Sequence, residues 1–211
     1  MAAKRSTKSA RSEGLPRLVI GISGASGAIY GIRLLKALKP LAVETHLVIS
    51  RAAELTIAYE TDYKIPDVRA LADASYAIGD LGAAIASGSF RTLGMVIAPC
   101  SIKTMAEIAT GVTSSLLTRA ADVTLKERRR LVLALRETPL HTGHLRSLLA
   151  LSEMGAVVAP PVPAFYAQPE SLEAMVDHTV GRLADLFGLD TGGVKRWAGP
   201  PPGRGRRNLE D

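Results

Sequence analysis

The chain has 211 residues, enough for one domain with a substantial hydrophobic core, and its 47% content of hydrophobic residues excludes a disordered or fibrous protein. Its longest apolar runs, such as Met95 to Cys100, are far shorter than the ~20 residues that a membrane-spanning helix needs. The net charge of +6 lies in the two ends, because residues 1–17 hold five Lys or Arg against one acid and residues 195–211 hold five against two. The nearly neutral remainder argues against a nucleic-acid partner.

Composition predicts a single domain over residues 17–197, between a disordered basic tail at 1–16 and a disordered Pro/Gly/Arg tail at 198–211. The first tail has no apolar segment and is therefore not a secretory signal. With Cys100 as the only cysteine, a reducing, cytoplasmic location is expected. The Arg, Ser and Ala content of the first tail leaves a mitochondrial presequence as a minority alternative.

Short apolar runs alternate with helix-length segments along the chain. In chain order, the pattern predicts a strand at 17–22, a helix at 27–39, a strand at 44–49, a helix at 51–60, a strand at 94–99, a helix at 103–110, a strand at 131–136, a helix at 140–152, a strand at 155–160 and a helix at 170–187. This alternation is typical of an α/β three-layer fold, in which helices cover both faces of a central parallel sheet. Ligands bind such sheets beyond the carboxyl ends of the strands.

The glycine-rich segment GISGASG at 21–27 joins the first strand to the first helix. Backbone N–H groups at the start of a helix stabilise a phosphate or another anion. NAD is disfavoured because Ile22 stands where the dinucleotide fingerprint needs glycine and Ser50 where it needs an acid, and ATP is disfavoured because no Gly-Lys-Ser/Thr ending follows. A tight turn without a ligand remains the alternative. The hydroxyls of Ser23 and Ser26 suit a polar heterocycle or a phosphate, although Ser26 could instead cap the helix.

Other candidate residues follow the later strands. Ser101 to Thr104 open a helix, either as an ordinary cap or as an anion site. Cys100 is a candidate nucleophile, with a small buried cysteine as the alternative. Arg136 and Glu137 end a predicted strand at the ligand edge, where Arg suits a phosphate.

Several further features have plain interpretations when each is taken alone. The charged run at 125–130 is typical of a solvated surface, and Glu60 would be assigned to the surface as well. Tyr166 lies in a Pro-rich segment and either offers its phenol to a ligand or packs at a turn. His141 and His144 are three residues apart, but with no third ligand nearby we expect no metal site.

Taken together, these segments resemble the UbiX-type flavin prenyltransferases, a flavoprotein family formerly described as aromatic-acid decarboxylases. The similarity runs from about Arg17 to Trp197. The motifs that carry it are GISGASGAIYG (21–31), ETHLVIS (44–50), ETD (60–62), ASGSF (86–90), PCSIKT (99–104), RAADVTLKERR (119–129), RETPLHTGHLR (136–146) and PPVPAFY (160–166). The resemblance implies a flavodoxin-like, Rossmann-like fold and a homo-oligomer, usually a dodecamer, with sites completed by neighbouring subunits. It also implies alkylation of reduced FMN at N5 and C6 by dimethylallyl monophosphate, yielding prenylated FMN for a UbiD-type decarboxylase, in quinone synthesis or in aromatic-acid breakdown.

The resemblance also implies roles for individual residues. The expected FMN-binding residues are Gly24, Ala25, Ser26, Ser50, Ser101, Ile102, Lys103, Thr104, Arg119 and Arg136. The residues expected around the prenyl phosphate are Lys126, Glu137, Tyr166 and Arg182. Ser26, Glu60 and Glu137 are the expected catalytic residues, the first two handling protons around the flavin ring. No Asp-Asp-x-x-Asp motif is present, which fits cationic side chains in place of magnesium.

Two rival functions share the expected fold. An FMN-dependent decarboxylase of a cysteine-derived substrate relies on a histidine early in the chain, and residues 51–140 contain none. The other rival is a non-catalytic FMN-binding subunit that docks on a decarboxylase. Ser114 and Ser115 depart from the acidic or amide residues that relatives often carry, which leaves the local helix packing open.

Overall fold

Six parallel strands form the central sheet in residues 14–199, the part of the chain that this computed structural model describes. The strands are β1 (Arg17–Ile22), β2 (Glu44–Ile49), β3 (Ala74–Tyr76), β4 (Gly94–Cys100), β5 (Arg130–Leu135) and β6 (Val157–Val158). Their order across the sheet is β3-β2-β1-β4-β5-β6, and every paired strand runs parallel to its neighbour. From β1 the chain adds β2 and β3 on one side, and it then adds β4, β5 and β6 on the other side. The connections therefore leave β1 and β4 in opposite directions, which opens a crevice at the carboxyl ends of these two strands.

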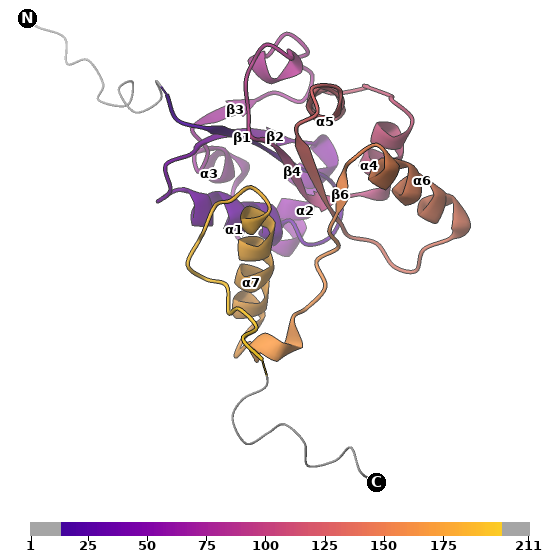
Figure 1. Cartoon of the computed structure of the whole chain (residues 1–211). Helices are drawn as coiled ribbons and strands as arrows, with labels where there is room; N and C mark the ends of the chain where they lie inside the picture. The colour runs from indigo at the N-terminus through magenta and orange to yellow at the C-terminus, as the bar shows by residue number, and fades with distance from the viewer. Residues whose placement is uncertain (1–13, 200–211) are drawn as a thin grey trace, which may run out of the picture.

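In the described part of the chain, seven α-helices cover the two faces of this sheet (Figure 1). One face packs against α1 (Ile29–Leu38), α2 (Arg51–Glu60), α3 (Ile65–Arg69) and α7 (Leu172–Asp185). The other packs against α4 (Ile102–Ala109), α5 (Leu116–Lys126) and α6 (Thr142–Glu153). The flavodoxin-like three-layer α/β fold expected from the sequence is therefore confirmed.

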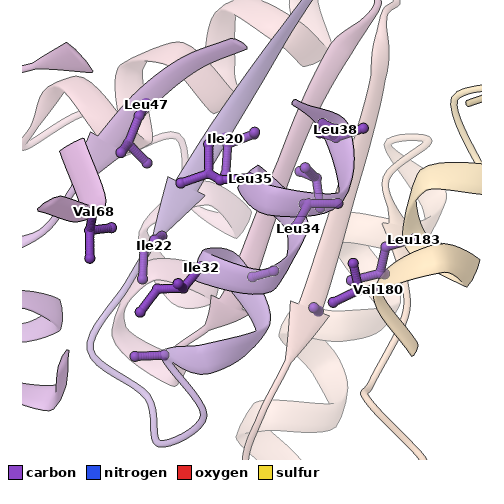
Figure 2. Packing of buried hydrophobic residues seen from close by; sticks show 14 of the residues in the cluster. Ile20, Ile22, Ile32, Leu34, Leu35, Leu38, Leu47, Val68, Val180 and Leu183 are labelled. Carbon is purple, nitrogen blue, oxygen red and sulfur yellow. The ribbon is translucent and has the colours of Figure 1, made fainter. Parts of the chain in front are cut away.

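The apolar core lies in two layers, one on each side of the sheet. Figure 2 shows the first, where Ile20 and Ile22 of β1 lie near Ile32 and Leu35 of α1. All four side chains are fully buried. Every residue of β4 is buried too, because helices cover both faces of this central strand. Gly31 lets α1 lie close to the sheet, since a Cβ there would be 2.4 Å from the carbonyl oxygen of Ala98.

All ten predicted elements exist, but their ends differ from the prediction. The strand predicted at 155–160 is paired only at Val157–Val158, and Pro160 and Pro161 beyond it have no N–H for a ladder. Arg136 lies just after β5 rather than at its end. The helix predicted at 170–187 is shorter at both ends and spans Leu172–Asp185. The prediction missed α3, β3 and α5.

The helix α5 was missed because its buried face is built largely of small and polar residues. Ala120, Ala121 and Thr124 lie on that face beside two leucines. Its start carries a capping box, in which Ser115 and Thr118 each bind the other's backbone N–H. The usual signature has Glu or Gln at the position of Thr118, so the motif was not recognised.

Of the predicted tails, residues 1–13 and 200–211 lie outside the described residues. Within residues 14–199, no helix combines the length and the apolar character needed to cross a membrane.

Candidate functional site

A hollow of about 430 Å³ lies at the carboxyl edge of the sheet, where β1, β2 and β4 end. Its position is the crevice at which open α/β sheets bind ligands, and its volume is within the range of small-molecule sites. The residues that line it are Gly24, Ser50, Arg51, Ala52, Ile78, Gly79, Ser101, Lys103, Thr104, Glu107, Ser114, Ser115, Leu117 and Thr118. We call this hollow the flavin cleft because its wall contains five of the ten residues expected to bind FMN.

Two helices point their N-termini at the flavin cleft. Ser50 caps α2, its Oγ accepting a hydrogen bond from the N–H of Ala53 at 3.1 Å. Ser101 caps α4 in the same way, accepting from the N–H of Thr104 at 3.3 Å. The first N–H groups of each helix have no carbonyl partner within the helix and remain available to a ligand. Together they form a site that favours an anion.

Two cations strengthen this anion site. Arg51 and Lys103 belong to the first turns of α2 and α4, and both line the flavin cleft. A cation at this end of a helix is unfavourable, because the helix dipole is positive there. The Nζ of Lys103 lies 3.7 Å from Glu107, and its side chain is 83% exposed. A bound anion removes the conflict by neutralising both side chains.

The opposite wall of the flavin cleft comes from α4, α5 and the loop between them. Ser114 donates a hydrogen bond to Glu107 at 2.9 Å, and the cap residues Ser115 and Thr118 lie beside it. Ile78 and Leu117 add apolar surface. Sequence reasoning did not assign this wall to the site. The serine pair at 114–115, whose departure from the family pattern was related only to local helix packing, could have pointed there.

At the end of the glycine-rich loop, the backbone N–H groups that precede α1 already have a partner. Glu60 at the end of α2 accepts hydrogen bonds from the N–H groups of Gly27, at 2.7 Å, and Ala28, at 3.2 Å. A carboxylate therefore already neutralises the start of α1, and these two donors are not free for a phosphate. The N-cap of α1 is Ala28, so Ser26 does not cap the helix. The anion site shifts to the starts of α2 and α4.

Gly24 joins the loop to α2 by close packing. A Cβ at this position would lie 2.3 Å from the Cβ of Ala52, in the first turn of α2. Glycine is thus required for the loop and the helix start to share the wall of the flavin cleft. Next to it, Ala25 is buried and Ser26 is exposed.

Ser23 and Cys100, both candidates from the sequence, are structural. Ser23 is fully buried, and its Oγ donates to the carbonyl of Pro99 at 2.9 Å and accepts from the N–H of Ser101 at 2.7 Å. These bonds join the ends of β1 and β4 and leave the hydroxyl unavailable to a ligand. Burial raises the pKa of the Cys100 thiol to about 12, so the thiolate needed for a nucleophile does not form near neutral pH.

Arg136 and Glu137 follow β5 at the same edge of the sheet. The backbone N–H of Arg136 donates to the carbonyl of Cys100 at 3.0 Å, and its side chain is exposed. Burial raises the pKa of Tyr30 on α1, and the positive charge of nearby Arg136 opposes that shift. Glu137 accepts a hydrogen bond from the N–H of Thr138 at 2.9 Å. The loop after β5 therefore presents both charges to solvent.

Tyr166 and Arg182 line a second hollow of about 380 Å³, between α7 and the segment that follows β6. The hydroxyl of Tyr166 is 3.5 Å from Nε2 of His178, and its ring meets that of Trp197 edge to face. Tyr166 is therefore packed and still 44% exposed. The packing interpretation of this residue is confirmed, and its role toward a ligand stays a prediction.

Lys126 and Arg119 lie at a third place, beside the loop at 86–90. The Nζ of Lys126 is 2.5 Å from Glu127, and Arg119 donates to the carbonyl of Ala86 at 3.3 Å. Arg129 donates to the carbonyls of Gly88 and Phe90, and its side chain is only 16% exposed. The interpretation of the run at 125–130 as a solvated surface is therefore wrong for Arg129, which holds this loop in place.

The residues expected around the prenyl phosphate are thus not brought together within one chain. Lys126 ends α5, and Arg182 belongs to α7. These two helices pack on opposite faces of the sheet. A small phosphate therefore cannot contact both side chains of the same chain.

The two neighbouring histidines have a capping role. Nδ1 of His141 accepts hydrogen bonds from the N–H groups of Gly143, at 3.0 Å, and His144, at 3.4 Å, at the start of α6. The two rings lie with their centroids 3.5 Å apart. Within residues 14–199, no three His, Cys, Asp or Glu side chains gather as metal ligands.

Comparisons with known proteins give the family. Residues 6–185 match the family model described as Flavoprotein. The flavin prenyltransferase UbiX of Thauera aromatica is 57% identical over 183 residues, which cover 87% of this chain and 94% of that protein. The chain belongs to the UbiX-type flavin prenyltransferases.

Solved structures of relatives agree with this assignment. The crystal structure of AnUbiX (PadA1) in complex with FMN and dimethylallyl pyrophosphate is 54% identical, with a TM-score of 0.87, and the match covers 88% of this chain and 99% of that one. A structure from Escherichia coli O157:H7, described as a dodecameric FMN-dependent UbiX-like decarboxylase, is 52% identical, with a TM-score of 0.85 over 87% of this chain and 100% of that one. The family resemblance stated from the sequence is confirmed.

The expected residues of this flavin prenyltransferase divide into those that line the flavin cleft and those that do not. Gly24, Ser50, Ser101, Lys103 and Thr104 line it. Ala25 and Ile102 are direct chain neighbours of lining residues, and Ser26 is two residues from Gly24. Arg119 and Arg136 do not contribute to its wall. Their roles, like those around the prenyl phosphate, remain predictions.

Proposed function

We propose that this flavin prenyltransferase transfers a dimethylallyl group from dimethylallyl monophosphate to N5 and C6 of reduced FMN, giving prenylated FMN. The observation that carries the proposal is the flavin cleft itself, where two helix starts and two cations favour an anion at the switch point of the sheet. The relatives at 54–57% identity, one of them solved with FMN and a dimethylallyl donor, support the same reaction.

The residues of the flavin cleft fit FMN. The starts of α2 and α4, with the hydroxyls of Ser50, Ser101 and Thr104, suit its phosphate, while Ile78 and Leu117 offer apolar surface to its ring system. Reduced FMN supplies the electron-rich N5 and C6 atoms that accept the prenyl group. Arg136 is proposed to approach the cofactor from the loop after β5.

The leaving phosphate is proposed to bind Lys126, Tyr166 and Arg182, with Glu137 beside them. Breaking the bond between an allylic carbon and a phosphate places negative charge on the leaving group, and preorganised cations stabilise that charge. Ser26 and Glu60 are proposed to hold and move protons. The two N–H bonds that Glu60 accepts fix its carboxylate one residue from Ser26, which supports this role.

We propose that the complete site forms between subunits of a homo-oligomer, a dodecamer like the relative from Escherichia coli O157:H7. The location of Lys126 and Arg182 on opposite faces of one chain supports this arrangement. A UbiD-type decarboxylase as the recipient of the product, and a cytoplasmic location, belong to the same proposal.

The test is an anaerobic incubation of the purified protein with reduced FMN and dimethylallyl monophosphate, followed by mass spectrometry of the extracted flavin. We expect a flavin heavier by one dimethylallyl group, and a parallel reaction with the pyrophosphate measures the choice of donor. A protein that binds FMN and yields no adduct with either donor would instead be a non-catalytic flavin carrier. Arg182→Ala should retain FMN while losing turnover.

A further inference from the structure

One carboxylate lies between two guanidinium groups beside the hollow that contains Tyr166. Asp185 accepts a hydrogen bond from Nη1 of Arg182 at 2.7 Å. It also accepts two from Arg196, with Nη1 on Oδ2 and Nη2 on Oδ1, both at 2.9 Å. The Asp185 side chain is 14% exposed, whereas those of Arg182 and Arg196 are 55% and 56% exposed. Both cations therefore face solvent around a largely covered acid.

The position of Arg196 is set by its neighbours in residues 194–197, which we call the C-terminal strap. Lys195 donates to the carbonyl of Ala167 at 3.1 Å, and its own carbonyl lies 3.3 Å from Nε2 of His178. The ring of Trp197 packs against Tyr166, with centroids 5.8 Å apart. The C-terminal strap thus holds the turn that carries Tyr166 and places Arg196 on Asp185.

Glycine makes the close approach of the C-terminal strap possible. A Cβ on Gly181 of α7 would lie 2.4 Å from Cγ2 of Val194. Gly181 directly precedes Arg182 in the chain. The same turn of α7 therefore carries Arg182, which is proposed to bind the phosphate, and Gly181, against which the C-terminal strap packs.

The charges of the three groups determine how much of Arg182 is left for a phosphate. Arg196 contacts both oxygens of Asp185 in a fork, a stronger arrangement than the single bond from Arg182. Arg196 first, and Arg182 with it, hold the pKa of Asp185 below its ordinary value, so the acid stays ionised. Two cations against one anion leave one positive charge. Asp190, 3.9 Å from Arg196, is a weaker and more exposed neighbour.

We propose that Arg196 is a positioning residue for the prenyl donor: it occupies Asp185 and so leaves the charge of Arg182 available to the donor's phosphate. This inference rests on the proposed function, in which Arg182 binds that phosphate. Without Arg196, Asp185 pairs one to one with Arg182, and a phosphate has to compete with the carboxylate. Arg196 itself does not need to touch the substrate.

The experiment compares wild type, Arg196→Gln, Asp185→Asn and the double variant, each loaded with FMN. Two quantities are measured: the Kd of dimethylallyl monophosphate for the complex with oxidised FMN, by calorimetry, and the KM and kcat of prenylation with reduced FMN. Arg196→Gln should raise Kd and KM about tenfold and leave kcat within about twofold, since it weakens substrate binding alone. Adding Asp185→Asn should restore both values, because the competing carboxylate is gone.

A purely structural role of Arg196 predicts a different pattern. Loss of the C-terminal strap would lower kcat and Tm together, and the second substitution, which removes another contact of α7, would add to the damage. The matched control is Arg33→Gln. It breaks the ion pair between Arg33 of α1 and Asp177, which lies on α7 as Asp185 does. It should leave Kd and KM unchanged.

The outcomes separate this inference from the proposed function. An unchanged Kd in Arg196→Gln, or a double variant no better than the single one, overturns the role of Arg196 even when wild type prenylates FMN. A wild type that binds the donor, responds to both substitutions as expected and forms no adduct overturns the proposed function alone.

Discussion

At the scale of single residues, tertiary contacts decided which polar side chains can serve a ligand. Ser23 and Ser26 belong to the same loop, but the hydroxyl of Ser23 forms hydrogen bonds with the backbone of Pro99 and Ser101, whereas Ser26 is exposed. Glu60, which taken alone belongs to the surface, caps a helix that begins 31 residues before it by accepting from two backbone N–H groups. Residue type alone did not distinguish these cases.

Cys100 gives a prediction about stability and pH. In the unfolded chain its thiol ionises above a pKa of ~8.5, whereas in the folded protein burial raises the pKa to about 12. Between these values the folded state binds more protons than the unfolded state, so the free energy of unfolding falls as pH rises. The stabilisation is fully present below pH ~8.5 and is lost as the pH approaches the folded pKa.

Urea titrations of wild type and Cys100→Ala at about pH 8 and about pH 10 measure this effect. Wild type should lose about 2 kcal/mol more than the variant between the two conditions, because other ionising groups contribute equally to both proteins. Parallel losses in the two proteins would show that Cys100 is accessible to water.

At the scale of elements, the starts of α2 and α4 form the anion site, and Gly24 sets how the loop after β1 meets α2. Five of the six strands could be predicted because buried parallel strands are continuous apolar runs, whereas β3 has only three residues, and none of them is fully buried. The helix α5 was missed although its buried residues follow the helical period, because alanines and threonines make up much of its buried face. With it, the part of the flavin cleft's wall that Ser115, Leu117 and Thr118 form was missed.

Gly24→Ala tests the packing at the flavin cleft. The added Cβ, 2.3 Å from that of Ala52, forces the first turn of α2 to move, at a cost of about 1–3 kcal/mol. We expect FMN affinity to fall about tenfold, a loss of about 1.4 kcal/mol in binding free energy, as measured by quenching of FMN fluorescence.

The compensating variant is Gly24→Ala with Ala52→Gly, which removes the atom that the new Cβ meets. It should bind FMN nearly as well as wild type. If the double variant binds as poorly as Gly24→Ala, the methyl group acts on FMN directly, and packing against α2 is not the reason for the glycine.

At the scale of the whole molecule, the sheet itself separates Lys126 from Arg182, because α5 and α7 lie on its opposite faces. This separation supports the proposed sharing of the site between copies of the chain; the relative from Escherichia coli O157:H7 is described as dodecameric. A closed symmetric assembly repeats the same contact, so every site draws on the same pair of surfaces.

Mixing two inactive variants tests this sharing. Lys126→Ala and Arg182→Ala should each lose most prenylation activity, and subunits of both, unfolded and refolded together in equal amounts, should recover about a quarter of the wild-type rate. That fraction is the share of sites that receive both side chains intact when each comes from a different copy. Mixed assemblies as inactive as the parents would place Lys126 and Arg182 of one site in the same chain.

The sequence by itself determined the parallel α/β fold, the family and most of one wall of the flavin cleft. These follow from local information: apolar runs, strand-to-helix turns such as 21–27, and ordered motifs. The tertiary structure decided how that loop is used. Glu60, brought to it by the packing of α2, occupies the N–H groups of Gly27 and Ala28, and the anion site lies instead at Ser50 and Ser101. Charge neutralisation at a helix start depends on which side chain reaches it through space, and no pattern within the loop records that.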